Sequence, residues 1–350
     1  MSGATQATAA QTPTAENRIR DERALVRSLR PFEEKSAATA FFQVASTLGL
    51  YVVAVGLMYA GLLQGYWIAL LLTLVAGAAV VRIFTLQHDC GHGSFLRSTT
   101  ANTWVGRLCS LFTYTPYRHW ARQHAGHHAN WNNLDRRESG VDIYSHCLTV
   151  EEYQALPRGQ RLAYRLRRNP ILLFGLLPPL IFTLLYRVPF DTPSDWQAER
   201  RSVWLTNAAL LLLWTLQVWA FGWLNVLLVQ GLVIVVASAM GTWLFFVQHQ
   251  FEHTAWMRKG EWSYTDAALR GSSHLQLPGL LRWVTGNIGL HPLHHLNPRI
   301  PNYQLRNAEK GSDVLAETPR LTIRGGLRAT AMALWDESAG RMVSFASLRT

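Results

Sequence analysis

Eight of the thirteen histidines of this chain gather in three short groups. They read His88-Asp89-Cys90-Gly91-His92, His124-Ala125-Gly126-His127-His128 and His291-Pro292-Leu293-His294-His295. In a helix, residues three and four positions apart share a face, so HxxxH and HxxHH each aim their imidazoles at a common point. A lone HxxxH would indicate no more than a polar helix face. Three such groups in one chain predict a metal site that they build together.

The number of imidazoles indicates more than one ion. A zinc site uses about four ligands, whereas imidazole-rich sets suit iron, and two irons can divide the eight histidines. His249, at the end of an apolar run, is a candidate ninth ligand, with a hydrogen-bonding role as the alternative. The cysteines form no CxxC pair, which argues against an iron–sulfur cluster and fits a reducing compartment; they are Cys90, Cys109 and Cys147.

Four polar residues near the groups are candidates to accept the ring N–H bonds of the ligands or to hold a metal-bound water. They are Asp89, Asp135, Glu252 and Asn287, and each has a solvated surface position as its alternative. Pro292 places His291 in extended chain or in the first turn of a helix. The histidines outside the groups are expected at the surface or the membrane interface, namely His119, His146, His253 and His274.

The composition places these groups beside a membrane. Hydrophobic residues make up 49% of the chain and charged residues 16%, against about 25% charged in soluble domains. The net charge of +11, combined with long uncharged runs, fits basic flanks on an anionic inner leaflet better than nucleic-acid binding.

Four apolar runs are each close to the ~20 residues that span a bilayer, and the second is broken only by Arg82 near its end. They cover residues 41–63, 67–86, 203–221 and 226–247. The run 171–186 contains Pro178-Pro179, which interrupts backbone hydrogen bonding, so we expect it at the interface. The four spans then form two hairpins, and every histidine group faces one side. Arg18 to Lys35 carry the basic flank that makes this side cytoplasmic.

The predicted fold is therefore an all-α integral membrane protein with four transmembrane helices as two hairpins, interfacial helices, and a cytoplasmic helical cap that holds a di-iron site. Residues 1–36 are expected to be a disordered or basic N-terminus, with Met1 to Thr14 disordered. Residues 37–310 would form the membrane domain and residues 311–350 a cytoplasmic tail.

Longer strings around the histidines carry a family resemblance. They are His88 to Phe95, His124 to Asp135, Asn287 to Leu296, and Ile300-Pro301-Asn302-Tyr303. The chain resembles the membrane fatty acid desaturases with three histidine boxes, in particular the bacterial acyl-lipid delta-12 or omega-6 type. The resemblance implies that the box histidines, and His249 as an additional one, ligate two irons. In that type a histidine directly follows the first histidine of the third box, whereas this chain has Pro292. The expected position of the double bond and the expected substrate depend on this difference.

The resemblance also implies the reaction and its partners. A double bond would be introduced into an acyl chain, carried by a lipid or an acyl carrier, while O2 is reduced to water. Electrons would come from a separate ferredoxin or small b-type cytochrome. The protein would lie in the bacterial inner membrane, in contact with its lipids. Nucleic acid is not expected as a partner. Candidate tunnel residues, with packing or anchoring at the membrane interface as the alternative, are Trp104, Trp243, Phe245 and Phe246. Candidate donor-docking or phospholipid-binding residues are Arg158, Arg161, Arg165, Arg167 and Arg168.

Three alternatives remain open on sequence grounds. A hydroxylase, ketolase or acetylenase on the same scaffold shares the first hydrogen abstraction and differs in its product. A membrane metal transporter should carry ionisable groups within its spans, and here the spans are almost free of them. In a membrane scaffold with incidental histidines, replacing His127 would leave the metal content unchanged.

Overall fold

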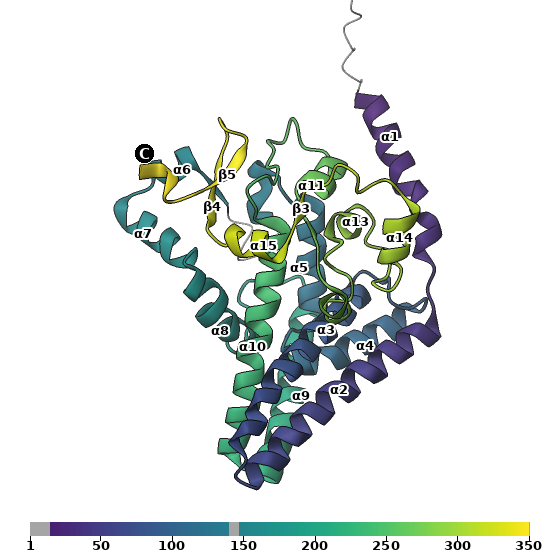
Figure 1. Ribbon diagram of the computed structural model, residues 1–350, viewed down its shortest axis with the longest axis vertical. Coiled ribbons are helices and arrows are strands. Elements are labelled where there is room, and N and C mark those ends of the chain that lie inside the picture. Colours follow the sequence, from purple (N-terminus) through teal and green to yellow (C-terminus); the bar gives the residue numbers. More distant parts are fainter. Residues whose placement is uncertain (1–14, 140–146, 350) are drawn as a thin grey trace, which may run out of the picture.

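The computed structural model describes residues 15–139 and 147–349. The expectations for Met1 to Thr14 and for His146 lie outside these residues. Four long helices form the narrow half of the molecule, and shorter helices and strands gather at the other end (Figure 1).

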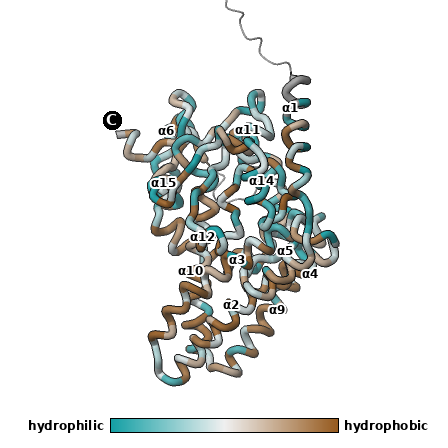
Figure 2. The backbone as a smooth tube through the Cα atoms, turned by 45° about the vertical axis from the view of Figure 1, so that its right-hand side comes forward, coloured by the Kyte–Doolittle hydropathy of each residue, from teal (hydrophilic) through white to brown (hydrophobic). Residues whose placement is uncertain are grey.

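The four long helical segments are apolar and long enough to cross a membrane, in agreement with the four predicted runs. Hydrophobic residues dominate this half of the chain trace (Figure 2). Two of these helices extend beyond the predicted runs and carry histidines at their ends. The segments are α2 (Ala37–Leu63), the 3-10 helix η2 (Trp67–Leu72) continued by α3 (Thr73–Gly91), α9 (Gln197–Phe221) and α10 (Trp223–His249).

The core of this half forms where α2, α3 and α10 meet. Small residues allow close approach: a Cβ on Gly77 of α3 would lie 2.7 Å from Cγ1 of Val236 on α10. The break between α9 and α10 is Gly222, whose φ of +79° favours glycine. The Gly77–Val236 contact packs α10 closely against α3, and these two helices carry His249 and His88 near their C-terminal ends.

A broken helix flanks α10, in the region 171–186 where we expected an interfacial segment. Pro178 lies in the first turn of α8, where a proline needs no backbone partner. The unit bends by 57° between its first helix and the rest, and by length and composition it fits either a fifth, broken span or a re-entrant loop. Its parts are α7 (Arg158–Arg167), the π-helical η4 (Leu172–Leu176), α8 (Leu177–Thr183) and η5 (Leu185–Arg187).

Short helices make up most of the other end of the molecule (Figure 1). One of them, α1 (Ala15–Ser28), lies within the N-terminal segment expected to be disordered or basic. The others are η1 (Arg30–Glu33), α4 (Thr99–Thr113), α5 (Tyr117–Asn130), η3 (Leu134–Ser139), α6 (Val150–Ala155), α11 (Tyr264–Arg270), α12 (Gly279–Val284), α13 (His291–Leu296), α14 (Leu305–Gly311), α15 (Ile323–Ala329) and η6 (Ser347–Arg349).

The all-α expectation is corrected by two small sheets. In one, β4 (Met332–Asp336) pairs antiparallel with β5 (Arg341–Ser344) and parallel with β1 (Leu148–Thr149). In the other, β2 (His274–Leu275) pairs parallel with β3 (Arg320–Leu321). The β4–β5 turn is built locally, because Asp336 accepts bonds from the backbone N–H groups of Ser338 and Ala339. The segment expected to be a tail, 311–350, is thus joined to the folded body.

Candidate metal centre

The helices α3, α5, α10 and α13 deliver all nine candidate histidines to one region. α3 carries His88 and ends at His92, α10 ends at His249, and α13 begins at His291. Pro292 occupies the first turn of α13, where the sequence placed it. The second half of α5 supplies His124, His127 and His128, the last two from its final turn.

The imidazoles form two adjacent groups. The nitrogen atoms of the first group, one from each ring, lie within 4.8 Å of one another; it consists of His88, His92, His124, His128 and His294. The second group consists of His127, His249 and His295 and meets the same limit. His291 adjoins the second group, since its Nε2 lies 2.9 Å from Nε2 of His249 and 3.1 Å from Nε2 of His295.

This arrangement fits two metal ions. Ligands bonded at about 2.1 Å around one ion have neighbouring nitrogens roughly 3.0–3.4 Å apart, depending on the coordination geometry. The Nε2 atoms of His128 and His124 are 3.1 Å apart, and those of His294 and His128 are 3.0 Å apart. Within the described chain, the buried Nε2 of His92 has no hydrogen-bond partner. A buried polar nitrogen of this kind calls for a ligand.

The electrostatics favour the ligand form of these rings. Burial lowers the pKa of His124, His128 and His294 well below its usual range, and positive charge on neighbouring imidazoles would lower it further. The same holds for His291 and His295. Neutral imidazole binds a metal, so these rings are ready to act as ligands at pH 7.

Asp89 lies beside one of the candidate ligands. Its Oδ1 lies 3.4 Å from Nδ1 of His88, and its Oδ2 accepts bonds from the backbone N and the Nδ2 of Asn302, at 2.7 and 2.8 Å. Asn302 is fully buried and also exchanges side-chain bonds with Gln43. The sequence showed Asn302 only as part of a family string, and its role as an anchor for Asp89 was missed.

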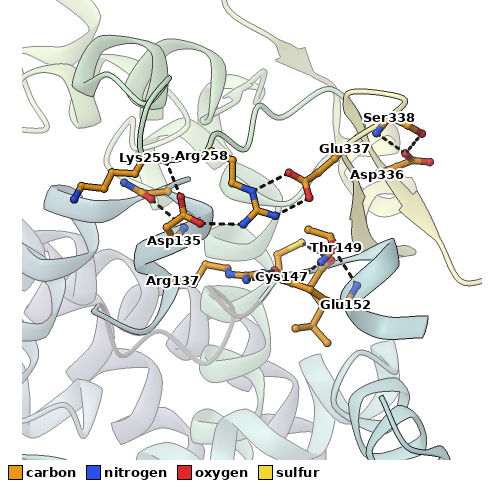
Figure 3. A network of polar contacts seen from close by, with 12 residues as sticks. Asp135, Arg137, Cys147, Thr149, Glu152, Arg258, Lys259, Asp336, Glu337 and Ser338 are labelled. Atoms are coloured by element: carbon orange, nitrogen blue, oxygen red, sulfur yellow. Dashed lines mark hydrogen bonds and ion pairs between the residues drawn. The ribbon is translucent and has the colours of Figure 1, made fainter. Parts of the chain in front are cut away.

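Three other candidates have partners away from the imidazoles. Asp135 accepts bonds from Nη1 of Arg258 at 2.9 Å and from the backbone N of Lys259 at 2.8 Å (Figure 3). Glu252 is exposed and accepts a bond from Arg341. Asn287, with a φ of +59°, donates to the backbone oxygen of Asn302. These residues became candidates because each is close to a candidate histidine along the chain. In the structure, the side chains of Asp135 and Glu252 bind other partners and not the imidazoles.

Two tryptophans hold the rings in place and were not singled out from the sequence. Trp120 stacks on His124 with ring centroids 4.7 Å apart and planes at 15°. Trp131 lies 4.1 Å from His249 and 4.8 Å from His127, centroid to centroid. A signal was available, because each tryptophan is four positions from a histidine on or next to the same helix, Trp120 from His124 and Trp131 from His127.

The remaining histidines differ in their settings. His253 is exposed, as expected. His119 is buried, contrary to the surface position expected, because its Nε2 lies 3.2 Å from a carboxylate oxygen of Asp191. His274 is partly buried, with its Nε2 3.7 Å from an oxygen of Glu309.

An apolar cavity of about 160 Å³ opens from the histidines into the membrane half. His88, His124 and His291 line one part of it, and Tyr51 and Gln230 line another. Among the four tunnel candidates, Phe245 lines the cavity. The others do not form this wall: Trp104 is 64% exposed, Trp243 packs at Gly326, and Phe246 packs on Phe174.

Helices apolar and long enough to span a membrane, a histidine cluster that could hold metal ions and an apolar cavity beside it are the features of a membrane enzyme for an apolar substrate. Residues 65–319 match the fatty acid desaturase family, and the chain belongs to that family. It is 38% identical to a fatty acid desaturase of Bacillus subtilis, over 94% of this chain and 92% of the relative. An sn-1 oleoyl-lipid 12-desaturase of Synechocystis is 30% identical, over 79% of this chain and 76% of that protein.

The family decides between the classes that the sequence left open. The chain is an oxidoreductase that desaturates fatty acyl chains, so neither the metal transporter nor the scaffold is its function. Among the described residues, the clustered imidazoles form two groups that could hold metal ions.

Proposed function

We propose that this chain is an O2-dependent acyl-lipid desaturase in which nine histidines hold two iron ions. His88, His92, His124, His128 and His294 would bind one ion, and His127, His249, His291 and His295 the other. The observation that carries the proposal is the division of the buried imidazoles into two groups at the mouth of an apolar cavity. Histidine-rich sites of this capacity suit iron.

When bound, the irons supply the oxidising power towards O2 that no side chain has. The overall reaction removes two hydrogens from adjacent methylenes. Those hydrogens, two electrons from a donor and two protons reduce one O2 to two waters, which balances the reaction.

The chain's own residues prepare this chemistry. Asp89 orients His88, and Trp120 and Trp131 hold the rings of His124 and His249. The apolar cavity wall excludes water and confines the acyl chain beside the ligands.

We place the centre on the cytoplasmic side of a bacterial inner membrane. The supporting features are the basic segment before α2 and the short breaks within the pairs α2–α3 and α9–α10, which favour two hairpins. In this arrangement residues 37–310 form the catalytic membrane domain, residues 1–36 a basic flank and residues 311–350 a cytoplasmic C-terminal segment.

The substrate and donor follow by analogy with the relatives. An sn-1 acyl-lipid omega-3 desaturase of Synechocystis, 30% identical, is named for ferredoxin, and an endoplasmic reticulum enzyme of Arabidopsis thaliana, 29% identical, for cytochrome b5. We therefore propose a membrane lipid as acyl carrier and a separate ferredoxin or small b-type cytochrome as donor. Arg158 and Arg167 on α7 are exposed and available for an acidic partner or lipid phosphate.

Product analysis tests the function. The chain is expressed in a bacterial host of defined lipid profile, beside His127→Ala, and total fatty acid methyl esters are compared by mass spectrometry. We expect a new unsaturated species that the variant lacks. A hydroxylated, keto or acetylenic product would show that the chain catalyses the alternative oxidation and not desaturation. An unchanged profile in a host that supplies both ferredoxin and cytochrome b5 would contradict the proposal.

A further inference from the structure

The cavity ends in the membrane half on two hydrogen-bonded polar side chains. Tyr51 of α2 and Gln230 of α10 both line it, and both are buried. The Tyr51 hydroxyl donates to Oε1 of Gln230 at 3.0 Å. Phe112 supports the Tyr51 ring edge to face, with centroids 5.1 Å apart. These contacts hold both side chains in one position.

A second layer lies behind this pair. Nε2 of Gln230 donates to Oε1 of Gln217 at 2.8 Å, and the Tyr59 hydroxyl donates to the same oxygen at 3.0 Å. The Tyr59 ring stacks on Phe221, with centroids 4.1 Å apart and planes at 4°. Three spanning helices, α2, α9 and α10, are therefore joined behind the end of the cavity. Uncompensated amides are costly in such a setting, and here each is bonded to another side chain.

One stripe of α10 lines the cavity along its length. The lining residues recur at helical spacing and include Gln230, Ile234, Ala237, Gly241, Phe245 and Gln248. From Gln230 to Gln248 the helix rises about 27 Å at ~1.5 Å per residue, and the next residue is His249 of the metal centre. One leaflet takes about half of the ~30 Å hydrocarbon core. The stripe is thus long enough to receive an acyl chain that passes the imidazoles.

The chemistry of the closed end decides which end of the substrate it receives. Tyr51, Phe112, Gln230 and Val233 are neutral, and a carboxyl ester with a headgroup would be desolvated beside them. The methyl end of an acyl chain loses nothing there, because burying apolar surface is favourable.

We propose that Tyr51 and Gln230 form the stop on which the methyl end rests, so that their distance from the metal centre selects the carbon pair to be desaturated. This inference rests on the proposed function and adds a rule to it: the position of the double bond is counted from the methyl end. A rigid stop makes such counting reproducible, and the two hydrogen-bonded layers supply that rigidity.

The test changes the depth of the cavity and measures the double-bond position by mass spectrometry of derivatised methyl esters. Tyr51→Ala lowers the stop, so the chain sinks further and the new bond moves away from the methyl end. Tyr51→Phe keeps the ring and should leave the position unchanged. Leu211→Ala, at a residue of α9 that is 70% exposed, is the control for a change elsewhere in the bundle.

A second variant, expected to shift the double bond in the opposite direction, tests the proposal even if Tyr51→Ala does not fold. Val233 lines the cavity one turn nearer the metal centre, so Val233→Phe should move the bond toward the methyl end. Unchanged positions in both variants, or in the one that accumulates in the membrane, would overturn the stop. The unmodified chain separates the two proposals, because its failure to form any product would contradict the proposed function itself.

Discussion

Asn302 holds the carboxylate of Asp89 with two hydrogen bonds, 2.7 Å from its backbone N and 2.8 Å from its Nδ2, across 213 positions of sequence. The contact joins the first histidine group to the segment that follows the third. It positions the other carboxylate oxygen beside Nδ1 of His88. The Asp89–Asn302 pair therefore ties the orientation of one candidate ligand to the closure of the whole centre.

Replacing Asp89 by Asn should weaken metal binding without unfolding the protein. The change removes a charged acceptor from His88, and losses of such supporting groups cost about 10–100-fold in metal affinity or activity. Iron content after dialysis against a graded chelator measures the effect. Asp135→Asn is the matched control, since Asp135 binds Arg258 and Lys259. Equal iron loss from both variants would contradict the distinct roles assigned to the two carboxylates.

Arg258 should matter for stability and leave the iron in place. It joins Asp135 after α5 to Glu337 in the β4–β5 turn (Figure 3). Its side chain is 44% exposed, so each ion pair is worth about 0.2–1 kcal/mol. Arg258→Ala should lower the thermal unfolding temperature slightly, by more than Arg324→Ala at an exposed position. A loss of iron in Arg258→Ala would show that this network belongs to the metal centre.

Acid should destabilise the iron-free protein. Burial lowers the native pKa of His124, His128, His291, His294 and His295 below 6.5. The unfolded chain, with imidazole pKa values near ~6.5, then binds more protons than the native one, so the free energy of unfolding falls as the pH drops below about 6.5. Thermal unfolding of chelator-treated protein in detergent, from pH 8 to pH 5, measures this. An unfolding temperature that stays constant or rises below pH 6.5 would contradict it.

The sequence predicted those features that depend on local spacing. Histidines at i, i+3 and i+4 on α5 share a face wherever the helix lies, and apolar runs of sufficient length predicted the four helices that could span a membrane. Pro292 at the start of α13 followed from its missing N–H.

The features that were missed depend on partners distant in sequence. Asp135 comes soon after the His124–His128 group along the chain, but its hydrogen bonds with Arg258 and Lys259 determine where its carboxylate lies. His119 is buried because Asp191 is beside it. The β4–β5 hairpin pairs with β1, only two residues long, which no periodicity could reveal. The role of Asn302 can be recognised only in the structure, where it donates hydrogen bonds to Asp89.

The most direct test of the centre is the metal content of His127→Ala measured beside His253→Ala. His127 belongs to the second imidazole group, whereas His253 is exposed outside both. Both proteins are purified from membranes, and iron is quantified per chain together with desaturated product. We expect wild-type iron and product in His253→Ala, and loss of both in His127→Ala with membrane insertion retained. Full iron content and activity in His127→Ala would contradict the assignment of the metal centre.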